Sequence, residues 1–332
     1  MLQKKRLTLM VPDLFAHIKH SASKQDFAHL SRALSKAKLN THSAPSDNIA
    51  HLATISGLEA FDAQAKAALY LNGCGRPLEA WGCYVSPVLM QPNRDHLSII
   101  QSSGFNFSEN ELKSLCAEFN DYFKEDGFQF RFLTPEIWIC FSENNPAVST
   151  VSPHDILGEN IIASLPSRGS DMQWRKLFNE TQMLLHHSSA NKDRILNGKI
   201  EINSLWFWGG GSLPAAYQSS MEVIYSNNFE VLGFAKLGGV KTHTLPVDVS
   251  KNLSSVYSEQ LIYIDLDHDQ IQEREAYSLI EQYLESFSKL LKDQLLDELI
   301  IIPDAKQSFI LTGGGLKKFW RSHKPITAFL PG

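Results

Sequence analysis

The sequence lacks the features that would place it in several large classes of protein. Its four cysteines include no Cys-x-x-Cys pair, so neither a zinc knuckle nor a disulfide framework is indicated. No apolar run reaches the roughly eighteen residues of a membrane-spanning helix, and the apolar stretch before Pro12 is too short for a signal-peptide core. We therefore expect a cytoplasmic protein with no membrane partner.

The chain also lacks an excess of positive charge. Its net charge is −5, and the basic residues at positions 4–6 are too few to change that balance, which argues against nucleic acid as the main partner. The chain has 332 residues, of which 43% are apolar and 20% charged, as in ordinary globular proteins. This length is enough for two domains.

Short uninterrupted apolar segments occur near both ends of the chain. Segments of this kind are typical of strands buried on both faces of a parallel sheet. A long helix with one apolar stripe is predicted between the last two of them. The predicted strands are Leu7–Val11, Glu230–Phe234, Gln260–Ile264 and Leu299–Ile302, and the predicted helix is Glu273–Gln294.

Aspartate follows three of these strands, as Asp13, as Asp265 or Asp267, and as Asp304. Ligand sites in doubly wound sheets form beyond the carboxyl ends of the strands. Carboxylates gathered there repel one another unless a cation or a proton neutralises them. These aspartates, with His268 or His323 nearby, therefore predict a metal site. The alternative is that aspartate is simply a common residue after strands.

The middle of the chain has a different sequence pattern, in which segments typical of antiparallel strands lie on either side of a helix. The helix, Glu109–Lys124, is preceded by Ser108 and carries Glu111 at the spacing of a capping box. This order of elements predicts an α+β unit separate from the first sheet. The predicted strands of this unit are Cys83–Met90, His96–Gln101, Gln129–Leu133 and Ile137–Phe141.

The most distinctive stretch runs from Asn179 to Pro214 and joins the two patterns. It contains Leu205-Trp206-Phe207-Trp208 followed by three glycines. The ordinary interpretation is a buried strand whose glycines form a tight turn, and the other is close approach of the backbone to a ligand.

A loop near residue 46 carries a second kind of candidate. Ser46 or Asp47 is placed to cap a helix that begins near Asn48. One interpretation is that a serine at this position caps the helix and has no other role. The same position suits a nucleophile, because a helix N-terminus favours the negative charge of an alkoxide or a phosphate.

The motifs of this chain resemble those of the proteobacterial RpfE-type putative regulatory proteins over nearly its whole length. They are more remotely similar to archaeal-type cofactor-independent phosphoglycerate mutases. The resemblance rests on NETQMLLHH at 179–187, Asn191, Arg194, Gly198, NSLWFWGGGSLP at 203–214, SPHDI at 152–156 with Gly158, GRPLEA at 75–80 and VPDLF at 11–15.

The resemblance implies an α/β fold of the alkaline phosphatase superfamily, with a mostly parallel sheet, helices on both faces and an inserted α+β domain. Residues 1–75 and 215–332 would form the first domain, and residues 76–214 the second. Active mutases carry two divalent metals at the strand ends and a serine that takes the phosphoryl group. For this chain the corresponding metal would be manganese, zinc or magnesium. The matching positions are Ser46 as nucleophile and Asp13, Asp304 and His323 as metal ligands, with Asp267 and His268 completing the site. The stretch from Asn179 to Pro214 would be the seam where the inserted domain rejoins the parallel sheet, with the glycines at a sharp re-entry.

The chain departs from the mutase pattern at two further ligand positions. Ala305 follows Asp304 where a histidine is expected, and Ile271 stands four residues beyond Asp267 where another is expected. Each lost ligand weakens a divalent metal considerably. We therefore expect the metal site to be incomplete or absent.

Two functions from different classes remain open. We favour a non-catalytic, regulatory relative that binds a small phosphorylated ligand or a regulatory protein partner in the old cleft. The alternative is an active metal-dependent phosphoglycerate mutase or phosphomonoesterase that uses Ser46 as its nucleophile. In that case Arg194 or Arg76 would clamp the phosphate, although an ordinary ion pair is the favoured role for Arg76.

Overall fold

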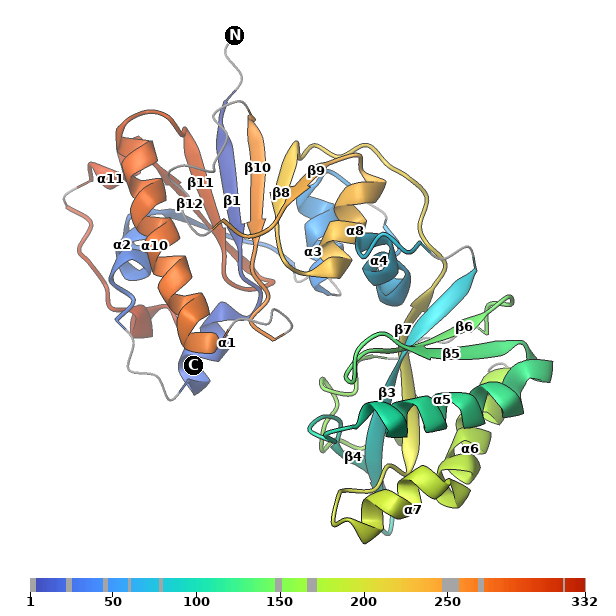
Figure 1. The fold of residues 1–332 in the computed structure, drawn as a ribbon. Coiled ribbons are helices and arrows are strands. Elements are labelled where there is room, and N and C mark those ends of the chain that lie inside the picture. Colours follow the sequence, from blue (N-terminus) through green and yellow to red (C-terminus); the bar gives the residue numbers. More distant parts are fainter. Residues whose placement is uncertain are drawn as a thin grey trace. The chain divides into compact units, whose positions relative to one another are not determined.

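The computed structural model describes residues 4–21, 26–43, 47–58, 61–77, 80–146, 151–165, 172–246, 257–267, 272–318 and 320–331. The chain divides into two compact units (Figure 1). Unit 1 contains residues 1–63 and 215–332, and unit 2 contains residues 64–214. Helix α4 (Lys66–Gly73), which precedes the expected boundary at residue 75, contacts strands β3 and β7 of unit 2.

Unit 1 is built on a seven-stranded, mostly parallel sheet, in agreement with the predicted fold class. The central strand β1 (Arg6–Met10) pairs in parallel with β10 (Glu259–Tyr263) on one side and β11 (Glu298–Ile302) on the other. Beyond β10 come β8 (Val223–Tyr225) and β9 (Lys241–His243), also in parallel. Beyond β11, β12 (Gln307–Thr312) and β2 (Lys38–Thr41) are each antiparallel to the strand before.

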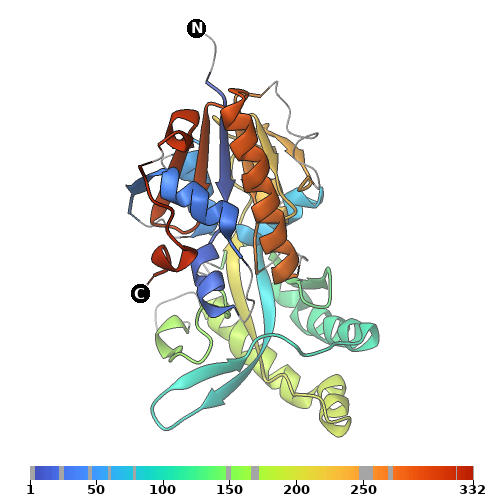
Figure 2. The ribbon, with the colours of Figure 1, turned by 90° about the vertical axis from the view of Figure 1, so that its left-hand side faces the viewer.

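Both faces of this sheet are covered. Leu7 and Leu9 of β1 belong to a core with residues of α10 (Glu273–Lys292) and α2 (Ala28–Lys36), and Met10 on the opposite face of the strand is also buried. Continuous burial explains why the strands read as unbroken apolar runs. The predicted stripe of α10 is confirmed, since Ile280, Tyr283, Leu284, Phe287 and Leu291 are all buried. Figure 2 shows α10 lying along the strands.

The remaining helices of unit 1 are shorter. Helices α3 and α8 pack against each other near β8 and β9, and none of the helices among the described residues is long and apolar enough to cross a membrane (Figure 1). The bounds are α1 Leu14–His20, α3 Asn48–Ile55, α8 Phe229–Leu237 and α11 Gly313–Leu316, with a short 3₁₀ turn η3 at Ile326–Ala328.

The prediction of a strand over Glu230–Phe234 was wrong, because this segment lies in helix α8. The side chain of Asn228 accepts hydrogen bonds from the backbone N–H groups of Glu230 and Val231 and so caps the helix. A short helix that is buried on several sides has an almost continuous apolar sequence, which looks like a buried strand.

Unit 2 is an α+β body with a five-stranded antiparallel sheet. The predicted capping box is confirmed, since Ser108 and Glu111 bond reciprocally at the start of α5. Its strands are β3 Trp81–Pro92, β4 Leu97–Gln101, β5 Phe128–Phe132, β6 Trp138–Ser142 and β7 Ser204–Gly211, and its other elements are α5 Glu109–Phe123, η1 Lys124–Asp126, η2 Ile162–Ser164, α6 Met172–His187 and α7 Ser189–Leu196.

The three glycines after Trp208 do not form the predicted tight turn. They are the last residues of strand β7, which pairs with β3 across a register shift near Gly82. A Cβ atom on Gly211 would lie 2.6 Å from the Cβ of Ala65, and one on Gly210 would lie 2.6 Å from the ring of Trp81. The glycines therefore permit close approach between elements of unit 2.

Candidate functional site

The carboxyl edge of the unit 1 sheet is the candidate site, because four adjacent parallel strands end there. In the order β11, β1, β10 and β8, these strands are followed by Asp304, Asp13, Asp265 and Asn228. Three aspartates that are remote in the sequence thus follow neighbouring strands of one sheet. This is the edge at which parallel sheets bind ligands.

Asp265 is the most buried of these aspartates, with 9% of its surface exposed. Its Oδ2 accepts a hydrogen bond of 2.9 Å from Nδ2 of Asn228, and its Oδ1 accepts one of 3.1 Å from the backbone N–H of Asp267. Asn228 thus connects the cap of α8 to this carboxylate. The sequence left Asp265 and Asp267 as alternatives for the strand-end aspartate, and the structure buries Asp265.

Asp267 lies farther out, with half of its side chain exposed. It faces His17, whose Nε2 lies 3.3 Å from Oδ1 of Asp267. His17 belongs to α1, which begins after Asp13. This contact therefore joins the segments that follow β1 and β10.

Asp13 has an unusual backbone conformation, with φ 55° and ψ 18° in the left-handed region. Aspartate tolerates this region better than most residues, but the conformation still costs free energy. Such residues are concentrated at functional sites, where the surrounding structure holds them. The observation supports keeping Asp13 in the candidate site.

Two histidines lie near Asp304 and were not among the predicted site residues. His51, in the first turn of α3, is 4% exposed, and its ring centroid lies 5.4 Å from that of His42. Burial lowers the pKa of His51, and His42 lowers it further, while the charge of Asp304 acts in the opposite direction. His42 follows β2, whose pairing with β12 brings it to this edge, and its backbone N–H bonds to the carbonyl of Lys306. No local sequence motif marks this pair, because the chain segments meet only through the sheet.

The structure does not describe all of the remaining predicted site residues. Ser46 and His268 lie outside the described residues. His323 is exposed on the segment after α11, and Arg76 is exposed after α4. Among the described residues, no three histidine, cysteine, aspartate or glutamate side chains are grouped so that they could hold one metal ion. The described donors alone therefore do not fit a divalent metal.

Arg194, the other predicted phosphate ligand, is buried inside unit 2 and bonded to the protein. Its guanidinium donates to Oε1 of Glu111 at 2.9 Å, to the carbonyl of Phe105 at 2.6 Å and to the carbonyl of Ile200 at 3.0 Å. The group also lies over the ring of Phe107, 4.8 Å from the centroid. These contacts join α5, α7 and the loop before β7.

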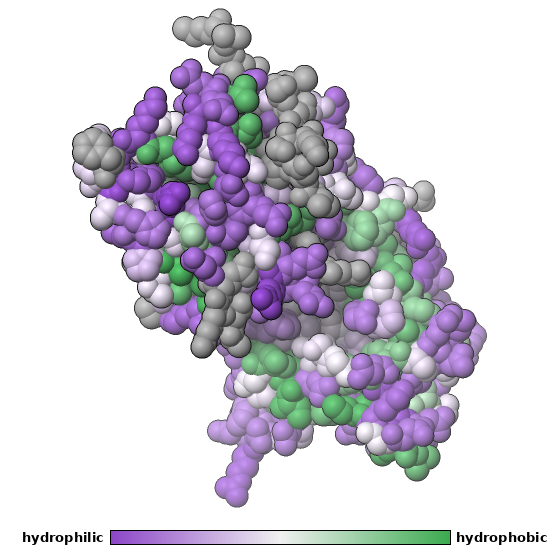
Figure 3. All heavy atoms as spheres, turned by 60° about the vertical axis from the view of Figure 1, so that its left-hand side comes forward, coloured by the Kyte–Doolittle hydropathy of each residue, from purple (hydrophilic) through white to green (hydrophobic). Residues whose placement is uncertain are grey.

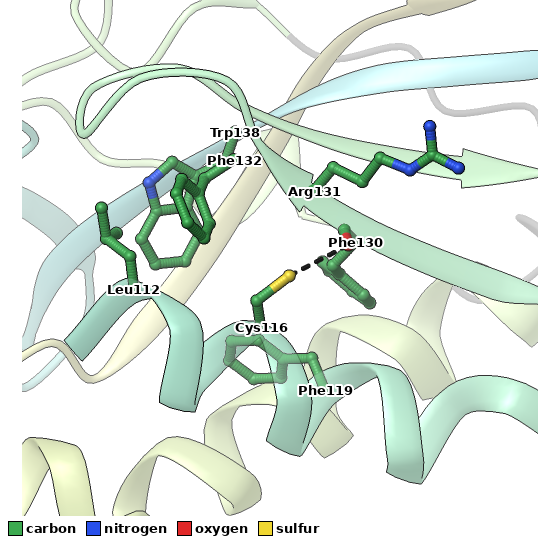
Figure 4. Close-up of a pocket in the computed structure, with 7 residues that line it drawn as sticks. All are labelled: Leu112, Cys116, Phe119, Phe130, Arg131, Phe132 and Trp138. Atoms are coloured by element: carbon green, nitrogen blue, oxygen red, sulfur yellow. Dashed lines mark hydrogen bonds between the residues drawn. The ribbon is translucent and has the colours of Figure 1, made fainter. Parts of the chain in front are cut away.

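Unit 2 also contains a small apolar pocket between α5 and the sheet. Its volume of about 10 Å³ is close to that of a single water position. Figure 4 shows the lining side chains around Cys116, whose Sγ donates to the carbonyl of Phe130 at 3.0 Å. Burial raises the pKa of this thiol, which disfavours the thiolate that a nucleophile requires.

Asn120 completes the polar contacts beside this pocket. Its Nδ2 donates to the carbonyl of Phe130 at 2.9 Å, and its Oδ1 accepts from the backbone N–H of Phe130 at 2.7 Å. The polar groups near Cys116 are thus bonded to one another, and the pocket offers no evident site for chemistry.

Comparison with known proteins gives a remote relationship. No protein-family model matches the chain. The chain is 29% identical over 136 residues to a probable 2,3-bisphosphoglycerate-independent phosphoglycerate mutase of Geobacter sulfurreducens, covering 39% of this chain and 33% of that protein. It is 40% identical over 63 residues to a 2,3-bisphosphoglycerate-independent phosphoglycerate mutase of Methanosarcina mazei, covering 19% of this chain and 16% of that protein.

A solved structure gives a comparison over more of the chain. The cofactor-independent phosphoglycerate mutase of Thermoplasma acidophilum aligns with 94% of this chain and 90% of its own, at 13% identity and a TM-score of 0.45. The sequence matches span a third or less of the mutases concerned. The chain thus has a remote similarity to cofactor-independent phosphoglycerate mutases.

Proposed function

We propose that this chain is a phosphoglycerate-mutase-like protein of the RpfE-type regulatory group that binds a ligand or partner at the carboxyl edge of unit 1 and does not catalyse phosphoryl transfer. The main support is the way the strand-end carboxylates are used. Asp265 accepts from Asn228 and from the backbone of Asp267, and Asp304 accepts from the backbone N–H of Lys306 at 2.7 Å. Carboxylates used in this way hold the local chain.

The identity of the neighbouring residues supports the same proposal. Ala305 and Ile271 stand where the mutase pattern has histidine ligands, and neither side chain can bind a metal. A two-metal clamp stabilises both the attacking and the leaving oxygen of a phosphoryl transfer, so it depends on a full ligand set.

The ligand proposed for this edge is a small phosphorylated molecule or a protein partner that contacts the strand ends. His17, His42 and His51 supply imidazole groups there, and imidazoles can donate hydrogen bonds to phosphate oxygens. Binding would take place where an active mutase has its catalytic cleft, without phosphoryl transfer.

One observation favours the alternative, an active mutase or phosphatase. His51 is buried near Asp304, and its lowered pKa favours the neutral imidazole that a general base requires. It lies in the first turn of the helix that follows Ser46 in the sequence. This arrangement would suit a serine nucleophile with a histidine near it.

The test combines metal analysis with two assays on the purified protein. We expect sub-stoichiometric metal and no conversion of 3-phosphoglycerate to 2-phosphoglycerate, or of p-nitrophenyl phosphate to phosphate, above background in the presence of manganese. Ser46→Ala is compared with the wild type, and Ser43→Ala is the matched control, since Ser43 lies exposed three residues earlier. A stoichiometric metal together with a rate that Ser46→Ala abolishes and Ser43→Ala retains would reject the proposal.

A further inference from the structure

The segment after α11 differs from the rest of the protein surface in its charge and in its tryptophan. Residues 317–324 contain three lysines, one arginine and one histidine, although the chain as a whole has a net charge of −5. Trp320 is 67% exposed, whereas Trp81, Trp138, Trp174 and Trp206 are at most 5% exposed. Tryptophan is highly buried on average, so an exposed one in a lysine-rich segment is unusual.

This segment is fixed against the end of α2. Nζ of Lys36 donates to the carbonyl of Lys318 at 2.7 Å and to that of Arg321 at 2.5 Å. In return, the guanidinium of Arg321 donates to the carbonyls of Lys36 and Ala37 at 3.0 and 2.7 Å. The backbone N–H of Lys324 donates to Oγ of Ser35 at 2.9 Å. The chain around Trp320 is therefore held by reciprocal bonds to one helix end.

Four lysines lie on or beside this anchored segment. Lys38 directly follows Ala37, and Lys38, Lys317 and Lys324 are exposed. Within the described part of the chain, no ion pair joins these three lysines or Lys318 to a carboxylate. We call the four lysines and Trp320 the basic surface. Figure 3 brings forward the side of unit 1 that carries α2 and α11, where hydrophilic side chains predominate.

We propose that the basic surface binds an acidic segment of a partner protein, one in which aspartate or glutamate flanks an aliphatic or aromatic side chain. The lysine ammonium groups would pair with the carboxylates, and Trp320 would bury its ring against the apolar side chain. Tryptophan is enriched among the residues that carry most of the binding energy of protein interfaces. Complementary charges around such an anchor speed association and select the partner.

A compact acidic segment fits better than a larger polyanion. A membrane or a nucleic acid duplex presents negative charge over a wide area. The remainder of this chain is acidic and would repel such an extended polyanion. Charges farther away than about 8 Å are largely screened at physiological ionic strength, so a short segment would experience mainly the four lysines. Arg321, which could bind phosphate bidentately, already bonds to two carbonyls.

The test measures binding of a fluorescently labelled peptide of alternating aspartate and leucine to the full chain by anisotropy. The triple variant Lys317→Gln, Lys318→Gln, Lys324→Gln is compared with Lys113→Gln, Lys124→Gln, Lys289→Gln, which makes the same change in net charge at exposed lysines elsewhere. We expect the first to raise the Kd by about tenfold and the second by less than about twofold. Raising the salt concentration should weaken the wild-type complex toward the level of the first variant.

A second variant, Trp320→Ala, separates the contribution of the tryptophan ring to binding from that of charge attraction. We expect a loss of about fivefold or more for the aspartate–leucine peptide and little change for a polyaspartate peptide, because only the first offers an apolar side chain. Circular dichroism melting of each variant shows whether the fold is retained.

Three outcomes would overturn the proposal. The first is the absence of saturable binding by the wild type. The second is an equal loss in the two triple variants. The third is tighter binding to phosphatidylglycerol vesicles or single-stranded DNA than to the peptide, with the same dependence on Lys317, Lys318 and Lys324. None of these measurements depends on the mutase assay, so this proposal and the proposed function fail separately.

Discussion

Arg194 shows how a residue chosen from a motif can have a structural role that the motif does not reveal. A buried guanidinium is costly unless its donors are satisfied, and here Glu111 and two carbonyls accept from it. Glu111 is also held by Lys199 at 2.9 Å and by the backbone N–H of Ser108 at 2.7 Å. One carboxylate thus joins the capping box of α5 to the turn between α7 and β7.

The stability of unit 2 should depend on pH through Glu111. Burial, the largest influence, raises the pKa of Glu111, but the bonds from Lys199 and Ser108 and the charge of Arg194 together lower it from 4.5 to about 2. Because the folded pKa is lower than the unfolded one, the stabilisation is present above about pH 4.5 and is lost as the pH falls toward about 2.

We expect urea unfolding of the wild type to show this loss, of the order of 2 kcal/mol, between about pH 5 and pH 2. Glu111→Gln should be less stable than the wild type near neutral pH and should have a flatter pH profile. Glu118→Gln, on the same helix, is the control and should follow the wild type. Equal pH profiles for the wild type and Glu111→Gln would contradict the assignment.

At the site, the sequence predicted the residues that follow strands and could not predict their partners. Asp13 and Asp304 could be found because each follows an apolar run and parallel strands share an edge. After the third strand the sequence left Asp265 and Asp267 open and favoured Asp267 as a ligand, whereas the structure buries Asp265. His42 and His51 could not, because their proximity depends on the pairing of β2 with β12 at the far end of the chain. Asn228 was missed because the strand was predicted over Glu230–Phe234, whereas the strand that Asn228 follows is β8 at Val223–Tyr225.

Among the elements, strand β7 shows that a run of glycines does not by itself predict a turn. Three glycines in a row suggest a turn because glycine is most often found there. In the structure they give room to Ala65 and Trp81, both distant in sequence from β7. The motif correctly predicted a buried strand with two tryptophans, but the neighbour that requires the missing side chains is known only after folding.

Gly211→Ala should therefore destabilise unit 2. The added Cβ would lie 2.6 Å from Cβ and 2.8 Å from Cα of Ala65, so backbone as well as side chain must move. We expect a loss of about 1–3 kcal/mol in the free energy of unfolding, measured by urea titration. Gly314→Ala is the matched control, because the nearest atom to its Cβ lies 3.9 Å away. A loss as small as that of the control would show that the contact relaxes at little cost.

The whole molecule consists of two units with separate cores. The core of unit 2 gathers residues from β3, α5, β5, α6 and β7, all between residues 64 and 214. The core of unit 1 combines residues of both ends of the chain. The sequence pattern predicted an α+β unit separate from the first sheet, because buried parallel strands and half-exposed antiparallel strands have different apolar patterns. The arrangement as an inserted domain was implied by the resemblance. The position of each domain boundary stays a prediction.

Unit 2 should fold without unit 1. We expect a polypeptide of residues 64–214 to show near-UV circular dichroism and a single cooperative urea transition, since its core is continuous in the sequence. A polypeptide of residues 215–332 is the comparison and should not fold, because β1, the strand between β10 and β11, is missing from it. A non-cooperative transition for residues 64–214 would show that unit 2 needs unit 1.

The bonds between Asn120 and Phe130 have a bearing on how molecules of this protein behave at high concentration. Strand β5 is at an edge of its sheet, and the free backbone groups of an edge strand are the template on which fibrillar aggregates grow. Asn120 takes both the N–H and the carbonyl of Phe130, at the centre of the strand. A strand from another molecule would find its pairing interrupted there, so a side-chain amide protects a strand of three phenylalanines against self-assembly.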